Sequence, residues 1–178
     1  MKTAPKKAIF LDRDGVINQD IGYLHEIDKF KFIDGVFDLC KKFIKSNYLL
    51  IIVTNQSGIA RGYYTISDFN KLNNWMLKRF RENGIAISAV YFCPHGPDDN
   101  CSCRKPKSGM ILDAVAHHNI DLENSWLIGD KFRDIESAIN GGIKNTIKIG
   151  LEKSDNGVII PTYTLKSLSK INEIDEIF

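Results

Sequence analysis

Apolar and polar positions along this chain fall into blocks of two kinds. Short apolar runs predict buried strands at residues 8–11, 49–53, 89–92, 125–128 and 145–149. Longer stretches with apolar residues three and four positions apart predict helices at residues 36–46, 67–83, 109–118, 132–140 and 165–178. Strands that alternate with helices in this way predict βαβ units, and hence an α/β fold: a doubly wound parallel sheet in a three-layer sandwich.

The ends of these blocks carry turn and capping residues. Ser67 is the predicted N-cap of the long helix 67–83, and Gly84 is its stop. Cys40 falls on the apolar face of the helix 36–46, which predicts that it packs in the core. Residues 19–32 mix aromatic and charged residues without a period, which is typical of a loop.

Length and composition limit the classes of protein that need to be considered. The 178 residues are 43% apolar and 26% charged, which is typical of a soluble globular protein and predicts one domain over 1–178. A net charge of +2 gives no reason to expect nucleic acid or membrane as a partner. No apolar run is long enough for a signal peptide or a membrane span, so we expect a cytoplasmic monomer.

Polar side chains follow three of the predicted strands directly. Asp12 and Asp14 come after the first strand, Thr54 after the second and Asp130 after the fourth. If the first strand lies between the other two, these groups meet at the carboxyl edge of the sheet, where open α/β sheets bind ligands. Carboxylates there suit Mg²⁺, and a hydroxyl with Lys105 would suit a phosphoryl group. Taken alone, the Asp-x-Asp-Gly segment is equally typical of a polar turn.

The order of the motifs resembles one family. Four segments are similar to the four motifs of the haloacid-dehalogenase-like phosphatases. They are Asp12-x-Asp14-Gly15, Thr54, Lys105 and Gly129-Asp130-x-x-x-Asp134. The resemblance implies that Asp12 attacks phosphorus to form an aspartyl phosphate, while Asp14 acts first as general acid and then as general base.

The resemblance also implies roles for the neighbouring residues. Thr54 and Lys105 would hold phosphoryl oxygens, together with backbone N–H groups of residues 55–57. Mg²⁺ would be bound by the side chains of Asp12 and Asp130 and by the carbonyl of Asp14. Asp134 would orient Lys105 or a water.

Three cysteines and a histidine lie close together in the segment 93–103. Cys93, His95, Cys101 and Cys103 form a complete ligand set for a closed, tetrahedral, structural Zn²⁺ site. In a reducing compartment metal is a better interpretation than a disulfide. The segment has almost no apolar side chains of its own and leads directly into Arg104 and Lys105, so we expect zinc to hold this loop and position the lysine.

The zinc loop narrows the resemblance to one branch of the family. Cys-x-His followed by Cys-x-Cys-Arg-Lys-Pro is similar to the branch that contains heptose-bisphosphate and histidinol-phosphate phosphatases. Other segments, including Gly22-Tyr23 and Thr54-Asn55-Gln56-Ser57-Gly58, are more similar to the heptose enzymes. The chain has no insertion for a large cap domain, so we expect an open crevice for a phosphorylated sugar.

The resemblance implies a set of catalytic and substrate-binding residues. The catalytic set is Asp12, Asp14, Thr54, Arg104 and Lys105. The substrate-binding set is Asp12, Arg13, Asp14, Asp20, Ile21, Gly22, Tyr23, Thr54, Asn55, Gln56, Ser57, Arg104, Lys105 and Lys131. Within the set, Arg104 or Lys131 would bind a second phosphate of the substrate.

Three alternatives remain open from the residues alone. A histidinol-phosphate phosphatase, or another phosphatase of small esters, would share every motif. A phospho-accepting receiver module also carries Asp, Thr and Lys on a parallel sheet, but its accepting Asp follows the third strand. A zinc-stapled binding protein with an inactive site is the third, although every motif position here is intact.

Overall fold

The first strand forms the centre of the sheet. The computed structural model describes residues 4–152 and 159–178, in which β1 (Ala8–Leu11) is completely buried and pairs in parallel with a strand on each side. The sheet has the order β3-β2-β1-β4-β5-β6, and all of its pairings are parallel. The other strands are β2 (Leu49–Asn55), β3 (Ala89–Cys93), β4 (Trp126–Gly129), β5 (Asn145–Ile149) and β6 (Tyr163–Leu165).

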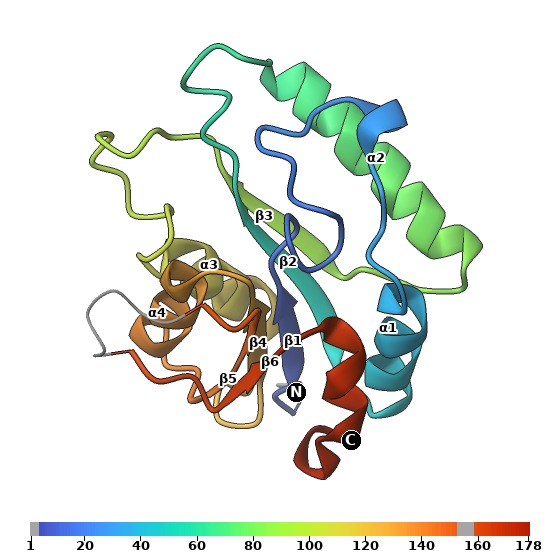
Figure 1. Cartoon of the computed structure of the whole chain (residues 1–178). Coiled ribbons are helices and arrows are strands. Elements are labelled where there is room, and N and C mark those ends of the chain that lie inside the picture. The colour runs from blue at the N-terminus through green and yellow to red at the C-terminus, as the bar shows by residue number, and fades with distance from the viewer. Residues whose placement is uncertain (1–3, 153–158) are drawn as a thin grey trace.

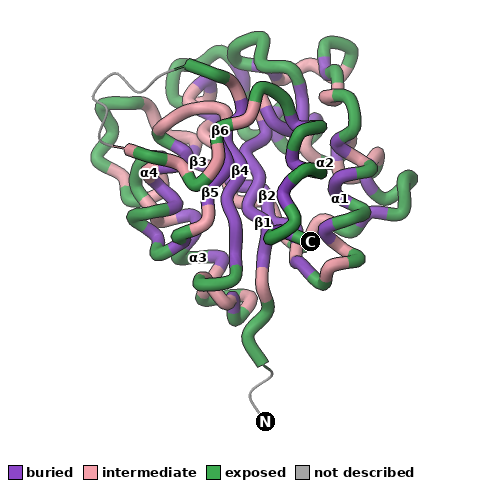
Figure 2. Tube along the Cα trace, turned by 60° about the horizontal axis from the view of Figure 1, so that its bottom comes forward, coloured by how far each residue is buried: buried purple, intermediate pink, exposed green. Residues whose placement is uncertain are grey.

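Two helices cover each face of this sheet (Figure 1). The helices are α1 (Val36–Lys45), α2 (Ile66–Glu82), α3 (Gly109–His118) and α4 (Phe132–Asn140). Alternate residues of β1 point to opposite faces, so Ile9 and Leu11 join the core under α1 and α2, while Ala8 and Phe10 join the core under α3 and α4. The predicted three-layer α/β sandwich is therefore confirmed, and Figure 2 shows the buried strands passing through its middle.

The structure corrects the predicted helix at 165–178. The segment begins at the last residue of β6 and then forms two short 3₁₀ helices, Leu168–Glu173 and Asp175–Ile177. Its buried residues are Leu168, Ile171, Ile174 and Ile177. The spacing of three residues matches the three residues per turn of a 3₁₀ helix, and Ile174 joins the two short helices in an extended conformation.

The N-terminus of α2 also differs from the prediction. Thr65, rather than Ser67, is the N-cap: its hydroxyl accepts a hydrogen bond from the Asp68 N–H, and the Asp68 carboxylate accepts one from the Thr65 N–H. This reciprocal capping box satisfies two backbone donors that the first helical turn leaves free. Ser67 is an exposed residue inside that turn.

Strand register brings three strand ends together at one edge of the sheet. Leu11 pairs with Ile52 of β2 and with Ile128 of β4, and the Asp12 N–H donates to the Ile128 carbonyl at 3.0 Å. The residues that follow each strand therefore meet around Asp12. Within residues 4–152 and 159–178, no helix has the length and apolar character that a membrane crossing requires.

Candidate active site

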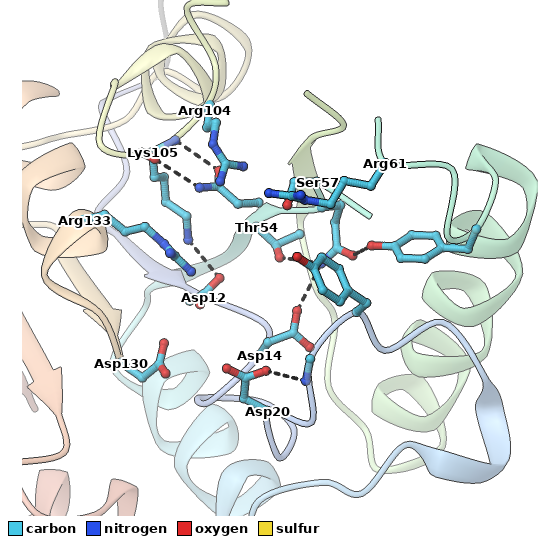
Figure 3. Close-up of a pocket in the computed structure, with 15 residues that line it drawn as sticks. Asp12, Asp14, Asp20, Thr54, Ser57, Arg61, Arg104, Lys105, Asp130 and Arg133 are labelled. Atoms are coloured by element: carbon cyan, nitrogen blue, oxygen red, sulfur yellow. Dashed lines mark hydrogen bonds and ion pairs between the residues drawn. The ribbon is translucent and has the colours of Figure 1, made fainter. Parts of the chain in front are cut away.

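A pocket of about 410 Å³ opens at the carboxyl ends of β1, β2 and β4. Figure 3 shows Asp12, Asp14 and Asp130 on one side of it, with Thr54 and Arg104 opposite. Polar and charged side chains dominate its walls, which suits a charged ligand better than an apolar one. The lining residues are Asp12, Asp14, Asp20, Gly22, Tyr23, Thr54, Asn55, Gln56, Ser57, Arg61, Tyr64, Arg104, Lys105, Asp130 and Arg133.

Lys105 lies between two carboxylates in the floor of this pocket. Its Nζ is 2.8 Å from Asp12 Oδ1 and 2.8 Å from Asp134 Oδ1, and it donates to the Val53 carbonyl at 2.9 Å. Burial raises the pKa of Asp12 to about 8, although Lys105 opposes this rise. Burial disfavours the charged form of Lys105, but the two carboxylates outweigh it and raise the pKa of the ammonium. The cluster thus holds one cation and two acids, an excess of buried negative charge.

Asp130 approaches the same cluster across Gly15. Gly15 has φ +88°, and a Cβ there would lie 2.4 Å from Asp130 Cγ, so only glycine leaves room for this carboxylate. Oδ2 of Asp130 contacts Lys131 Nζ at 2.9 Å, while its Oδ1 is buried without a hydrogen-bond partner. Carboxylate oxygens of Asp12, Asp130 and Asp134 lie within 4.8 Å of one another. Asp130 Oδ1 is thus a buried oxygen that receives no hydrogen bond and lies near other carboxylate oxygens, an arrangement that fits a divalent cation such as Mg²⁺.

Hydrogen-bond donors surround the Asp14 carboxylate. Oδ1 accepts from Asn18 Nδ2 at 2.9 Å, and Oδ2 accepts from Arg13 Nη2 at 2.9 Å and from Gln56 Nε2 at 3.1 Å. Arg13 is only 1% exposed and also donates to the Leu24 carbonyl. Arg13 is not among the residues that line the pocket, and its guanidinium holds the Asp14 carboxylate. Contact of the Arg13 side chain with substrate stays a prediction.

Asn55, at the end of β2, and the following Gln56 line the pocket and also make hydrogen bonds with backbone groups of other segments. Asn55 exchanges two hydrogen bonds with the backbone of Lys105, at 3.0 and 3.1 Å, and so fixes the start of the segment that carries the lysine. The Gln56 N–H donates to the Cys93 carbonyl at 2.7 Å. The Gln56 N–H is therefore already engaged and not free for a phosphate, so the expectation for residues 55–57 does not hold at this one position.

The pocket differs from the predicted substrate set in several further positions. Ile21 and Lys131 are absent from its lining; Ile21 is exposed beside it, and Lys131 contacts Asp130. Sequence reasoning missed Arg61, Tyr64 and Arg133, which do line it. Arg133 could have been found, because it follows Asp130 by three residues and lies in the first turn of α4 at the same sheet edge.

The Cys/His loop folds into one cluster. Cys93 and Cys101 have their sulfurs 3.8 Å apart, and His95 Nδ1 is 3.5 Å from Cys93 Sγ and 3.3 Å from Cys103 Sγ. Two thiolates about 2.3 Å from a tetrahedral zinc would be about 3.8 Å apart, so the spacing fits that metal. Burial raises the pKa of the Cys93 and Cys103 thiols, a cost that a bound cation would offset.

The arrangement of these motifs on a parallel sheet defines the class of haloacid-dehalogenase-like hydrolases, and a family model described as HAD-hydrolase-like matches residues 102–170. The chain is 48% identical to the D-glycero-alpha-D-manno-heptose-1,7-bisphosphate 7-phosphatase of Campylobacter jejuni, over 94% of this chain and 95% of that protein. It is 43% identical to the D-glycero-beta-D-manno-heptose-1,7-bisphosphate 7-phosphatase of Yersinia pestis, over 92% of each. The chain therefore belongs to the phosphatase family that these relatives represent.

A solved structure shares the fold over nearly the whole chain. The D,D-heptose 1,7-bisphosphate phosphatase from B. bronchiseptica superimposes with a TM-score of 0.82 at 30% sequence identity, covering 94% of this chain and 96% of that one. That protein was crystallised with magnesium and phosphate.

The raised pKa of Asp12 predicts how stability depends on pH. The pKa of Asp12 in the folded protein, about 8, lies above its ordinary value of 3.8. Between these two pH values Asp12 therefore keeps a proton in the folded state that it loses in the unfolded state. In magnesium-free buffer the proton that Asp12 keeps adds to the free energy of unfolding. This contribution is full below about pH 4 and is lost as pH rises toward 8, by up to about 1.4 kcal/mol per pH unit. Asp12→Asn lacks this titration, so urea denaturation should show its stability relative to wild type increasing from pH 5 to pH 8. The exposed Asp38→Asn is the control, and parallel pH profiles for wild type and Asp12→Asn would contradict the assignment.

Proposed function

We propose that this single domain removes the 7-phosphate of D-glycero-D-manno-heptose 1,7-bisphosphate through an aspartyl phosphate at Asp12. Such a reaction would supply nucleotide-heptose synthesis for lipopolysaccharide or another surface glycan. The observation that carries the proposal is the buried Asp12–Lys105–Asp134 cluster at the floor of a polar pocket. The two heptose-bisphosphate phosphatases, 48% and 43% identical over most of the chain, support the substrate.

Asp12 is the nucleophile in this proposal. Its carboxylate stands at the end of the central strand and would attack phosphorus in line with the leaving oxygen. Lys105 Nζ is 2.8 Å from Asp12, so its positive charge would stabilise the charge that develops on a phosphoryl group beside that carboxylate. Thr54, at the end of β2, offers a hydroxyl to a second phosphoryl oxygen.

The side chains of Asp12 and Asp130, with the carbonyl of Asp14, would hold Mg²⁺. When bound, the cation neutralises part of the charge on the phosphoryl group and on the carboxylates, which favours an ionised Asp12. The partnerless Oδ1 of Asp130 supports this site.

Asp14 is the proposed acid and base. It lies two residues beyond Asp12 and lines the pocket, so it can protonate the leaving alcohol and then take a proton from the water that attacks the aspartyl phosphate. A carboxylate in this position promotes hydrolysis of the aspartyl phosphate, so it favours an enzyme over a receiver module, which retains its phosphoryl group.

Arginines at the mouth of the pocket would bind the second phosphate. Arg104, Arg61 and Arg133 all line it, and a guanidinium can donate two parallel hydrogen bonds to phosphate. Arg104 also donates to the His95 carbonyl at 3.2 Å, which ties it to the Cys/His loop. Lys131 is a weaker candidate, since Asp130 contacts its ammonium at 2.9 Å.

Zinc in the Cys/His loop would take no part in phosphoryl transfer and would instead hold the loop in shape. Four ligand side chains leave no open position for water, so the metal in this loop would be structural. Cys103 precedes Arg104 and Lys105 in the chain, so a closed cluster limits the movement of both cations.

A substrate comparison tests the function. We expect kcat/KM with Mg²⁺ to be highest for the heptose 1,7-bisphosphate and roughly ten- to a hundredfold lower for a heptose monophosphate, because a charge-assisted hydrogen bond to the second phosphate contributes about 1.5–3 kcal/mol. Histidinol phosphate, with its cationic amine, should be a poor substrate beside three arginines. Asp12→Asn should be inactive on all three, and Asp14→Asn slower by roughly 10²–10⁴.

Two results would count against the proposal. A preference for histidinol phosphate would contradict the sugar assignment and leave the phosphatase assignment intact. Turnover by Asp12→Asn at the wild-type rate would contradict the aspartyl-phosphate mechanism itself.

Metal analysis tests the zinc proposal. Protein purified without chelators should contain about one zinc per chain, and Cys101→Ser should lose it together with most of the activity. Cys40→Ala is the matched control, because this buried cysteine lies in α1, outside the cluster. Full activity in zinc-free protein would refute the role of the metal in positioning Arg104 and Lys105.

A further inference from the structure

We propose that Gln56 and Tyr64 are positioning residues that aim two groups of the reaction, the carboxylate of Asp14 and the hydroxyl of Thr54. The inference rests on the proposed phosphatase function and goes beyond it, because neither side chain needs to touch the substrate. Both are buried, Gln56 to 2% and Tyr64 to 6% exposure. They connect the floor of the pocket to the segment between β2 and α2.

The Gln56 side chain makes hydrogen bonds at both ends of its amide. Its Nε2 donates to Asp14 Oδ2 at 3.1 Å and to Thr54 Oγ1 at 2.9 Å. Its Oε1 accepts from the Tyr64 hydroxyl at 2.6 Å. The two amide hydrogens and the amide oxygen are thus all used, by three different partners.

While the Asp14 carboxyl is ionised, only one orientation of the amide satisfies this network. If the group turned over, Oε1 would face the Asp14 carboxylate, and two acceptors would repel each other without a hydrogen between them. Tyr64 stabilises the observed orientation, since a phenol hydroxyl that donates to Oε1 directs the NH₂ group toward Asp14. Burial raises the pKa of Tyr64 to about 12, so its hydroxyl stays protonated and able to donate near neutral pH.

The orientation of Gln56 has a consequence for Thr54. Because Thr54 Oγ1 accepts a hydrogen from Gln56, its own hydrogen is free to point elsewhere. Thr54 lines the pocket, so this hydrogen is available to a phosphoryl oxygen. A single amide therefore aims a carboxylate at the leaving oxygen and a hydroxyl at the phosphoryl group.

The ring of Tyr64 is itself fixed by its neighbours. A Cβ at Gly58 would lie 2.2 Å from Cε1 of the ring, so Gly58 is small because the ring packs against its backbone. On another side the ring stacks with His25, with centroids 4.9 Å apart and planes 14° apart. These contacts do not involve the hydroxyl, so removing the oxygen alone should leave the ring in place.

Tyr64→Phe tests the inference directly. It deletes the donor to Gln56 and keeps the packing, so we expect a Tm lower by only a few degrees and an unchanged KM. For the best sugar phosphate, kcat/KM should be roughly two- to tenfold lower, because Gln56 then holds Asp14 and Thr54 less firmly. The loss should be smaller for p-nitrophenyl phosphate, because its phenolate leaves without a proton and needs Asp14 less. Tyr91→Phe is the control and should behave as wild type on both substrates, because it removes a hydroxyl contact to His117 of α3 and neither residue lines the pocket.

A double variant separates positioning from a general structural role. Gln56→Met has nearly the same length but cannot donate to Asp14 or Thr54. If Tyr64 acts through Gln56, adding Tyr64→Phe to Gln56→Met should cause no further loss of kcat/KM. Additive losses, or equal losses on the sugar phosphate and on p-nitrophenyl phosphate, would overturn the inference.

The outcomes also separate this inference from the proposed function. A wild-type protein that hydrolyses no phosphate ester would refute the proposed function. An active wild type together with a fully active Tyr64→Phe would refute only the positioning role.

Discussion

The site depends on one buried ion cluster, in which the ammonium of Lys105 lies between the carboxylates of Asp12 and Asp134. Taking three charges out of water is costly, and removing one partner of such a cluster leaves an uncompensated buried charge. Backbone groups around the cluster hold the Asp134 carboxylate in place. Asp134 Oδ2 accepts from the Lys131 N–H at the start of α4, and a Cβ at Gly129 would lie 2.3 Å from Asp134 Cβ. The close approach of β4 and α4 therefore fixes the carboxylate that holds the lysine.

The elements that build this cluster come from distant parts of the chain. β1 leads to Asp12, the turn after β4 leads to Asp134, and the Cys/His loop leads to Lys105. Asn55 at the end of β2 binds the Lys105 backbone through two hydrogen bonds and so joins that loop to the sheet. An excess of negative charge remains, and it adds to burial, the larger cause, in raising the pKa of Asp12. A divalent cation at Asp12 and Asp130 would relieve that excess, which ties metal binding to ionisation of the proposed nucleophile.

Sequence patterns predicted the elements whose hydrophobic period is unambiguous. The bounds of α3, α4 and β5 agree with the expectation, and β1 lies between β2 and β4 as the convergence of Asp12, Thr54 and Asp130 required. The prediction for the tail is wrong, because apolar residues three positions apart also occur on one face of an α-helix, whereas here they lie in and between two 3₁₀ helices. Side-chain direction was the other limit. Nothing in the sequence shows that Arg13 turns away from the pocket, or that Tyr64, eight residues after Gln56, returns to donate to its amide.

The central claim is that Asp12 becomes phosphorylated during turnover. Mixing Asp14→Asn with p-nitrophenyl phosphate and Mg²⁺ should let the first step proceed, since nitrophenolate needs no proton, and should slow hydrolysis of the intermediate. After a rapid acid quench, mass spectrometry should find one phosphoryl group on the intact chain, and peptide mapping should locate it at Asp12. A quenched protein without added phosphate despite release of nitrophenolate, or with the phosphate on another residue, would contradict the account.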